Sequence, residues 1–173
     1  MSQSIEEHVR QLVKEVASTL NDRGLILTSA ESCTGGWIAQ ALTSLPGSSM
    51  WFDSGFVTYS NSSKQRLLGV PGSLLSDHGP GAVSELVVKA MATGALTNSA
   101  GDVAVATSGI AGPDGGSEGK PVGTVWIGWA HRDGRCRAQN HHFSGDRYDV
   151  RLKTVEQALQ GILDLLDSPC LSD

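Results

Sequence analysis

The chain has 173 residues, 39% of them hydrophobic and 18% charged, with a formal net charge of −5. This composition is typical of one folded domain with a buried core and excludes a disordered chain. The acidic balance argues against nucleic-acid binding, which needs a basic face, although a few cations and backbone N–H groups can still bind one phosphate.

Hydrophobic periodicity and turn residues predict alternating helices and strands in the first half of the chain. In order, the expected elements are a helix from Ser4 to Gly24, a strand over residues 25–30, a helix over 37–45, a strand over 55–60 and a short helix that contains Lys64. A capping box begins at Ser4, and Asn61 or Ser62 is the expected cap of the short helix. Residues 69–80 are rich in turn formers.

The second half is predicted to add a helix, three strands and a final helix. The first of these helices begins after Ser84 and Glu85, the strands cover residues 103–106, 122–129 and 136–143, and the last helix covers 149–166. Asp133-Gly134 marks a tight turn between antiparallel neighbours. This order predicts a single α/β domain over residues 1–173, built as a three-layer α/β/α sandwich with a mixed sheet.

Polar segments follow three of the predicted strands, at residues 31–36, 59–64 and 107–116. If these strands are parallel, the segments meet in one cleft, because ligands bind beyond the carboxyl ends of strands in an open α/β sheet. Ser32 lies just before a helix start, where backbone N–H groups can stabilise an oxyanion or a phosphate.

Lys64 is a candidate base for Ser32. A serine hydroxyl needs a base to become a nucleophile, and burial can lower a lysine pKa toward neutrality. Tyr59 could hold the lysine or relay a proton. On the residue pattern alone, a helix-capping serine and a solvated surface lysine are the more common interpretation.

Other residue patterns also have two interpretations each. Cys33 is a rival nucleophile if the helix start favours its thiolate, whereas a cysteine is usually a small buried side chain. The glycine-rich segment 109–116 can cradle an anion through its N–H groups or form a flexible surface loop. Arg147 and Arg151 share a helix face and can clamp a phosphate or form solvated ion pairs.

No metal site is predicted, because His141 and His142 would point to opposite faces of a strand and no zinc-binding spacing occurs. No run approaches the ~20 apolar residues of a membrane span, and the N-terminus does not resemble a signal peptide. The cysteines Cys33, Cys136 and Cys170 are therefore expected to be reduced thiols in a cytoplasmic protein.

Several long motifs in a fixed order carry a family resemblance. They are residues 28–36, 55–61, Lys64, 81–85, 108–116, 120–125 and 143–147. Together they resemble the CinA C-terminal domain family, which includes stand-alone nicotinamide-nucleotide amidases, and such a set is far more specific than one glycine pattern. One departure is His-Gly-Pro-Gly-Ala at residues 78–82, which has two residues more than the usual His-Gly-Ala and lengthens a loop.

The resemblance implies hydrolysis of nicotinamide mononucleotide (NMN) to nicotinic acid mononucleotide and ammonia, which recycles the pyridine nucleotide. It implies an α/β/α fold and no metal or nucleotide cofactor. Ser32 and Lys64 match the catalytic positions of the family, with Tyr59 nearby. The residues expected to bind substrate are Thr34, Gly35, Gly36, Ser108, Gly109, Gly112 and Arg147.

Two other functions remain open from the sequence. The domain could be a catalytically silent nucleotide-binding module that serves DNA-uptake or recombination partners, although its acidic charge argues against direct DNA contact. It could also be a small amidase that acts on another amide. A symmetric homodimer is the expected assembly, because α/β domains of this size often form one.

Overall fold

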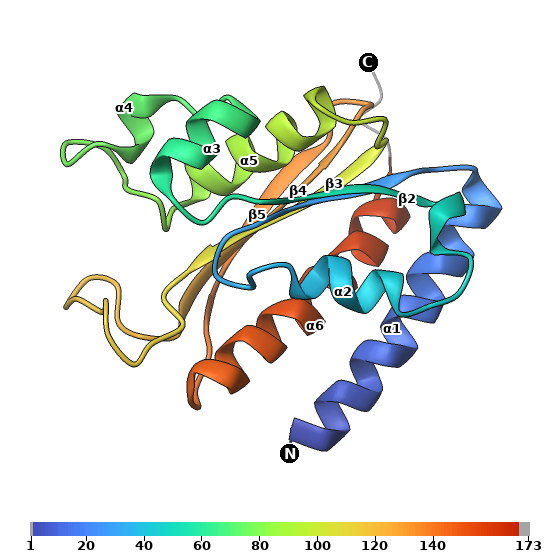
Figure 1. Cartoon of the computed structure of the whole chain (residues 1–173), viewed down its shortest axis with the longest axis horizontal. Helices are drawn as coiled ribbons and strands as arrows, with labels where there is room; N and C mark the ends of the chain where they lie inside the picture. The colour runs from blue at the N-terminus through green and yellow to red at the C-terminus, as the bar shows by residue number, and fades with distance from the viewer. Residues whose placement is uncertain (1, 170–173) are drawn as a thin grey trace.

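The computed structural model describes residues 2–169, and its centre is a five-stranded mixed sheet (Figure 1). The strands are β1 (Leu27–Glu31), β2 (Phe52–Val57), β3 (Val103–Gly109), β4 (Thr124–His131) and β5 (Cys136–His142), in the order β2-β1-β3-β4-β5. β1 pairs in parallel with both β2 and β3, whereas β4 and β5 are antiparallel to their neighbours. The carboxyl ends of β1, β2 and β3 therefore lie at the same end of the sheet.

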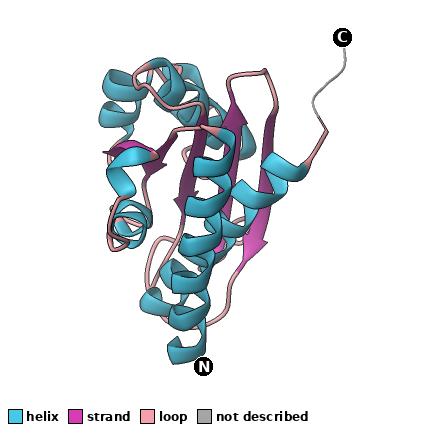
Figure 2. Cartoon of the chain, turned by 90° about the vertical axis from the view of Figure 1, so that its right-hand side faces the viewer, coloured by secondary structure: helices cyan, strands magenta, loops and turns pink. Residues whose placement is uncertain are grey.

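Helices cover both faces of this sheet (Figure 2). On one face lie α1 (Ser2–Arg23), α2 (Trp37–Thr43) and α6 (Arg147–Asp167), and on the other lie α3 (Asn61–Leu68), α4 (Gly72–Leu75) and α5 (Glu85–Thr97). A short 3₁₀ helix, η1 (Ser48–Met50), precedes β2. The predicted three-layer α/β/α sandwich with a mixed sheet is thus confirmed.

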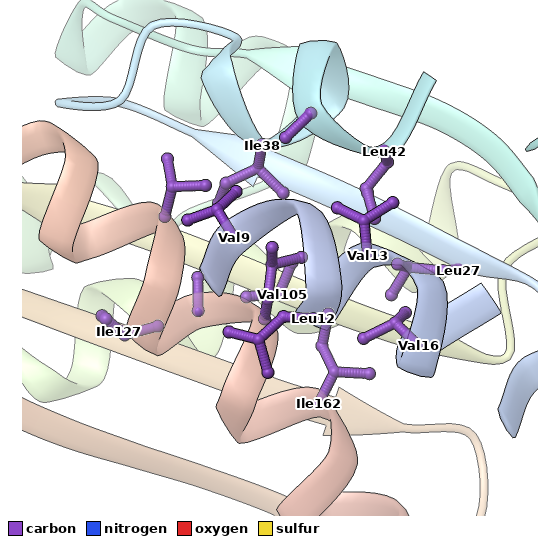
Figure 3. Packing of buried hydrophobic residues seen from close by; sticks show 14 of the residues in the cluster. Val9, Leu12, Val13, Val16, Leu27, Ile38, Leu42, Val105, Ile127 and Ile162 are labelled. Atoms are coloured by element: carbon purple, nitrogen blue, oxygen red, sulfur yellow. The ribbon is translucent and has the colours of Figure 1, made fainter. Parts of the chain in front are cut away.

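The two faces of the sheet are packed differently. Under α1, α2 and α6 the core consists of branched aliphatic side chains, as Figure 3 shows for Val9 and Leu12 of α1, Val105 of β3 and Ile162 of α6. Under α5 the sheet presents small alanines instead. Gly94 of α5 lies so close to α3 that an added Cβ would be 1.9 Å from the Leu68 carbonyl oxygen.

The predicted element boundaries need several corrections. α1 begins at Ser2, so Ser4 lies inside the helix and the capping-box prediction is wrong; the Ser2 hydroxyl instead donates to Asp149 of α6 at 3.0 Å. α3 is capped by Ser60, whose Oγ accepts the N–H of Ser63 at 3.1 Å, and not by the residues predicted. The helix α4, within the turn-rich segment, was not predicted.

Strand and helix ends also differ from the prediction. β2 ends at Val57, because the chain then turns into the cap of α3, and β3 continues to Gly109 because it stays paired with β4. α6 begins at Arg147, two residues early, because Asp146 caps it by accepting the N–H of Asp149 at 3.0 Å. Within residues 2–169, no helix is long and apolar enough to cross a membrane.

Candidate active site

Ser32 directly follows β1, in a turn that leads into α2. The buried carboxylate of Glu31 accepts hydrogen bonds from the backbone N–H groups of Gly36, Ile38 and Ala39 at 2.8 to 3.0 Å. These bonds fix the turn against the start of α2. They also occupy N–H groups that the sequence had suggested for an oxyanion or a phosphate, so the start of α2 does not offer them to a ligand.

Ser32 lies in a row of hydroxyl residues at the carboxyl ends of the parallel strands. The pairing register aligns Glu31 with Val57 and Thr107, so that Ser32 lies between Thr58 and Ser108. The Ser32 N–H continues this pairing by donating to the Thr107 carbonyl at 3.0 Å. Successive side chains of a strand point to opposite faces of the sheet. By this alternation along β1 and β3, the side chains of this row point toward the face that α3 and α5 cover.

Lys64 reaches this row from α3 and is 1% exposed. Its Nζ lies 3.0 Å from Ser32 Oγ, and it donates to the carbonyl oxygens of Thr58 at 2.8 Å and Tyr59 at 3.3 Å. Burial lowers the pKa of the amine below its usual 10.5. As an ammonium, Nζ would donate to all three oxygens. Once the amine has lost a proton, its two N–H groups match the two carbonyls and its lone pair faces the Ser32 hydroxyl.

Tyr59 does not hold the lysine through its side chain. Its ring is 62% exposed, and its hydroxyl accepts a hydrogen bond from Arg147 at 3.0 Å, so only its backbone carbonyl contacts Lys64. Arg147 also donates to the Gly112 carbonyl at 2.8 Å. A cavity of ≈ 570 Å³ lies beside Arg147 and is lined by Gly112, Arg147 and Arg151, among other residues.

The turn after Ser32 contains three of the predicted substrate-binding residues. The Thr34 side chain is fully buried, with its Oγ1 2.9 Å from that of Thr107, which turns it away from solvent. Gly35 and Gly36 have φ values of 64° and 95°, in the left-handed region that favours glycine. Both glycines lie at the surface, beside Trp37 in a smaller cavity of ≈ 370 Å³.

The remaining predicted site residues lie at the end of β3 and in the loop beyond it. The Ser108 hydroxyl donates to the Ala82 carbonyl at 2.7 Å, just ahead of α5. Gly109 ends β3 so close to β4 that a side chain there would meet Val125. Gly112 lies further along, at the cavity beside Arg147. The structure therefore brings these residues to the same end of the sheet as Ser32.

Cys33 is not equipped to act as the nucleophile. Its side chain is 5% exposed, and burial raises the pKa of its thiol to about 12. The predicted preference for a thiolate at this position is therefore wrong, because loss of water outweighs any help from the helix start. Cys33 and Cys136 are free thiols, and Cys170 lies outside the described residues.

Some residues of the site were missed or misread in the sequence. Glu31 has a sequence signal, since an acidic residue just ahead of a helix often caps it. Thr58 and the carbonyl-binding contacts of Arg151 have no such signal. Arg151 donates to the carbonyls of Cys33 and Thr34, and it lines the same cavity as Arg147. The phosphate clamp formed by the two arginines stays a prediction. Within residues 2–169, no group of three or more His, Cys, Asp or Glu side chains is arranged to hold a metal ion.

This fold and site define an α/β protein with a serine and a buried lysine in contact beyond the carboxyl ends of parallel strands, an arrangement known for serine nucleophiles with a lysine base. The chain belongs to the CinA C-terminal domain family, whose sequence profile matches residues 9–166.

Named proteins and solved crystal structures are similar to this chain. The chain is 54% identical to nicotinamide-nucleotide amidohydrolase PncC of Enterobacter agglomerans, over 91% of this chain and 95% of that protein. It is 51% identical to the protein of the same name from Escherichia coli K12, over 90% and 93%. The crystal structure of competence/damage inducible protein CihA from Agrobacterium tumefaciens matches with a TM-score of 0.88 and 42% identity, over 91% of this chain and 95% of that one.

Proposed function

We propose that this protein hydrolyses the amide of NMN to nicotinic acid mononucleotide and ammonia, with Ser32 as nucleophile and Lys64 as base. The names of its relatives support the substrate, since the similarity extends over most of both chains. The single observation in this chain that carries the proposal is the 3.0 Å distance between Lys64 Nζ and Ser32 Oγ, in surroundings that lower the lysine pKa.

The first half of the reaction transfers the acyl group to Ser32. Neutral Lys64 accepts the hydroxyl proton of Ser32 as Oγ bonds to the amide carbon of the substrate. The negative charge that develops on the carbonyl oxygen is stabilised by backbone N–H groups near Ser32 or Gly109. The C–N bond then breaks, and the Lys64 ammonium gives its proton to the departing nitrogen, which leaves as ammonia.

The second half hydrolyses the resulting ester. Lys64, neutral again, takes a proton from water, whose oxygen attacks the acyl carbon, and the Ser32 oxygen leaves and regains its proton from Lys64. The Thr58 hydroxyl is suited to hold this water, because Oγ1 is buried, has no hydrogen-bond partner within residues 2–169 and lies in the same row as Ser32.

The substrate phosphate is assigned to Arg147 and to N–H groups of the glycine-rich loop. Arg147 borders the cavity of ≈ 570 Å³ with Gly112, and its side chain is exposed. Guanidinium groups match the geometry of phosphate oxygens. Arg147 is favoured over Thr34, whose hydroxyl is buried and faces Thr107.

Ammonia release from NMN by the purified protein, compared with its Ser32→Ala variant, tests the proposal. We expect the variant to lose about three or more orders of magnitude in kcat, because the covalent route disappears. Ser18→Ala is the matched control, since Ser18 is exposed on α1, which covers the face of the sheet opposite Lys64, and it should remain active.

Three results would contradict the proposal. Near-wild-type ammonia release by Ser32→Ala would show that Ser32 is not the nucleophile. Tight NMN binding by the wild-type protein without turnover would instead identify a silent nucleotide-binding module. Release of ammonia from free nicotinamide as fast as from NMN would identify an amidase with a different substrate preference.

A further inference from the structure

The guanidinium group of Arg151 lies against the turn that follows Ser32. From the second turn of α6, its Nη2 donates to the Thr34 carbonyl at 2.7 Å and its Nε donates to the Cys33 carbonyl at 3.2 Å. Its charged plane also lies over the Trp37 ring, 5.2 Å from the ring centroid. One side chain thus holds two consecutive peptide groups directly after the proposed nucleophile.

These contacts determine where the neighbouring N–H groups point. In a trans peptide the C=O and N–H bonds point in opposite directions, so fixing the Cys33 carbonyl toward Arg151 fixes the Thr34 N–H on the other side. The preceding peptide is fixed in a similar way, because the Ser32 carbonyl accepts the N–H of Gly35 at 3.1 Å. That contact orients the N–H of Cys33.

In this turn, the N–H groups of Cys33 and Thr34 are the ones that do not donate to another residue. Ser32 donates to Thr107, Gly35 donates to Ser32, and Gly36 donates to Glu31. Within residues 2–169, the Thr34 N–H donates to no residue, and the Cys33 N–H contacts only the sulfur of its own side chain. Unused N–H groups directly after a nucleophilic serine are the usual donors to a tetrahedral oxyanion.

We propose that Arg151 is a positioning residue: it holds the Cys33 and Thr34 carbonyls, and thereby the turn, so that the N–H groups of Thr34 and Cys33 bind the oxyanion formed on Ser32 attack. The Thr34 N–H is fixed directly through the Cys33 carbonyl, and the Cys33 N–H is fixed through the bond from Gly35 to the Ser32 carbonyl. This inference rests on the proposed function. The charged hydrogen bond on the Cys33 carbonyl also polarises the peptide between Cys33 and Thr34, which strengthens the Thr34 N–H as a donor. Arg151 therefore acts on the transition state through the turn that it holds. It lines the same cavity as Arg147, but its guanidinium group donates to the two carbonyls, whereas Arg147 is assigned to the phosphate.

The two arginines should differ in the kinetic constant that they control. An oxyanion forms only after attack, so losing its donors lowers kcat and leaves KM for NMN almost unchanged. Removing one such donor costs about 10²–10³ in kcat, and misplacing the donors should cost about tenfold or more. Loss of a phosphate contact would instead raise KM.

Steady-state kinetics with NMN on Arg151→Met and Arg151→Lys test the inference. We expect both to lower kcat, because a lysine cannot reproduce the two-pronged contact of a guanidinium. Arg137→Met is the matched control: Arg137 also lies over a tryptophan, Trp129, at 5.1 Å, and donates to the Gly161 carbonyl at 2.6 Å, but belongs to β5. It should keep the wild-type kcat.

Chemical rescue separates positioning from folding. In Arg151→Ala, added guanidinium ion at non-denaturing concentrations should restore part of kcat, because it can occupy the vacated site between Trp37 and the two carbonyls. Unchanged kcat and KM in Arg151→Met would overturn the inference, as would a higher KM with unchanged kcat. A loss of kcat that only follows the loss of folded protein, with no rescue, would also overturn it.

Failure of this inference can be told from failure of the proposed function. If the wild-type protein releases no ammonia from NMN, or Ser32→Ala stays active, the proposed function fails whatever the Arg151 variants do. If the wild-type protein is active and Ser32→Ala is not, an unchanged kcat in Arg151→Met rejects the role of Arg151 alone.

Discussion

The amine of Lys64 is buried from water and contacts two carbonyl oxygens and the Ser32 hydroxyl. This environment makes the ammonium form costly, because the charge is buried away from water, and it lowers the pKa of the amine. A lysine at the surface would stay protonated at neutral pH and could not accept a proton. Burial of this one side chain therefore connects the packing of α3 to the proposed chemistry.

The pH dependence of activity should report this lowered pKa. We expect kcat/KM to rise with pH as Lys64 loses its proton, with a midpoint below the usual lysine value of 10.5. The free energy of unfolding should rise with pH between the folded pKa and 10.5, since the unfolded chain binds the proton more tightly in that range. Ammonia release and urea denaturation at matched pH values measure both.

The variants Lys64→Met and Lys89→Met complete this test. Lys64→Met should be inactive and should lose the rise in stability with pH, because no buried amine is left to titrate. Lys89 pairs with Glu85 near the surface, so its replacement should leave both profiles unchanged. A Lys64→Met protein with the wild-type pH profile of kcat/KM would rule out Lys64 as the base.

Cys33 offers a second prediction for a single residue. Because burial raises the pKa of its thiol to about 12, the thiol stays protonated at neutral pH. Cys33→Ala should therefore keep a kcat close to that of the wild-type protein, measured as ammonia release from NMN. A folded but inactive Cys33→Ala protein, checked by circular dichroism, would show instead that the thiol takes part.

Sequence reasoning went furthest for residues that follow strands. Ser32 and Lys64 were placed in polar segments that would meet if the strands were parallel, and the parallel pairing of β1, β2 and β3 brings them into contact. The contacts of Arg151 with this turn could not be predicted, because its partners are backbone carbonyls of a distant segment. Such contacts depend on the rotation and tilt of α6, which no local sequence pattern specifies.

Among the elements, α2 depends most on one buried group. Glu31 accepts three backbone N–H groups at the start of α2, so its carboxylate acts as the cap of this seven-residue helix. An isolated helix of this length would not be stable in water. The turn at residues 32–36, which carries Ser32 and lies between Glu31 and α2, is held in place by the same contacts.

We expect Glu31→Gln to lower the free energy of unfolding by about 1–3 kcal/mol, because the amide has one acceptor oxygen and turns an NH₂ group toward N–H donors. Its kcat should fall as well, since the turn that carries Ser32 loosens. Urea denaturation and NMN kinetics measure the two effects. Glu85→Gln is the control: Glu85 is exposed in the first turn of α5 and pairs with Lys89. Equal stability of Glu31→Gln and Glu85→Gln would disprove this account.

Element boundaries were harder to predict than element types. Every helix of eight residues or more was predicted from the sequence. However, α3 and α6 begin earlier than expected, because Ser60 and Asp146 cap them. Several adjacent polar residues can each cap a helix, and the one that does is decided by how the chain leaves the sheet. The short helix α4 has too few residues to show a period.

At the scale of the whole molecule, the distance between the α3–α5 layer and the sheet sets the position of Lys64. Alanines and Gly128 on this face of the sheet allow α5 to pack closely on the strands, and Gly94 on α5 allows α3 to pack closely against α5. Strand order could not be read from the sequence, because the connection from β2 to β3 has to pass β1 before it pairs. The layers follow from the patterns, whereas this crossover is a property of the assembled sheet.

Gly94→Ala tests how closely α3 and α5 are packed within their layer. In an exposed helix, replacing glycine by alanine stabilises by about 1 kcal/mol. At Gly94 the new Cβ would be 1.9 Å from the Leu68 carbonyl oxygen, so α3 and α5 must separate. We expect a loss of about 1–3 kcal/mol in the free energy of unfolding, together with a lower kcat because α3 carries Lys64.

The control for this change is Gly119→Ala, where an added Cβ would meet no atom within 4 Å. Thermal melting and NMN kinetics on both variants make the comparison. A stabilised, fully active Gly94→Ala protein would mean that the two helices can separate at no cost to the site.

The carboxylate of Glu31 has one more consequence, which concerns how the substrate arrives. Because it neutralises the start of α2, the helix dipole does not attract an anion there. Under the proposed function, the attraction for the phosphate then comes mainly from Arg147, whose exposed charge is screened by dissolved ions beyond about 8 Å at physiological ionic strength. Salt should therefore weaken capture of the nucleotide while leaving the buried Ser32–Lys64 step untouched.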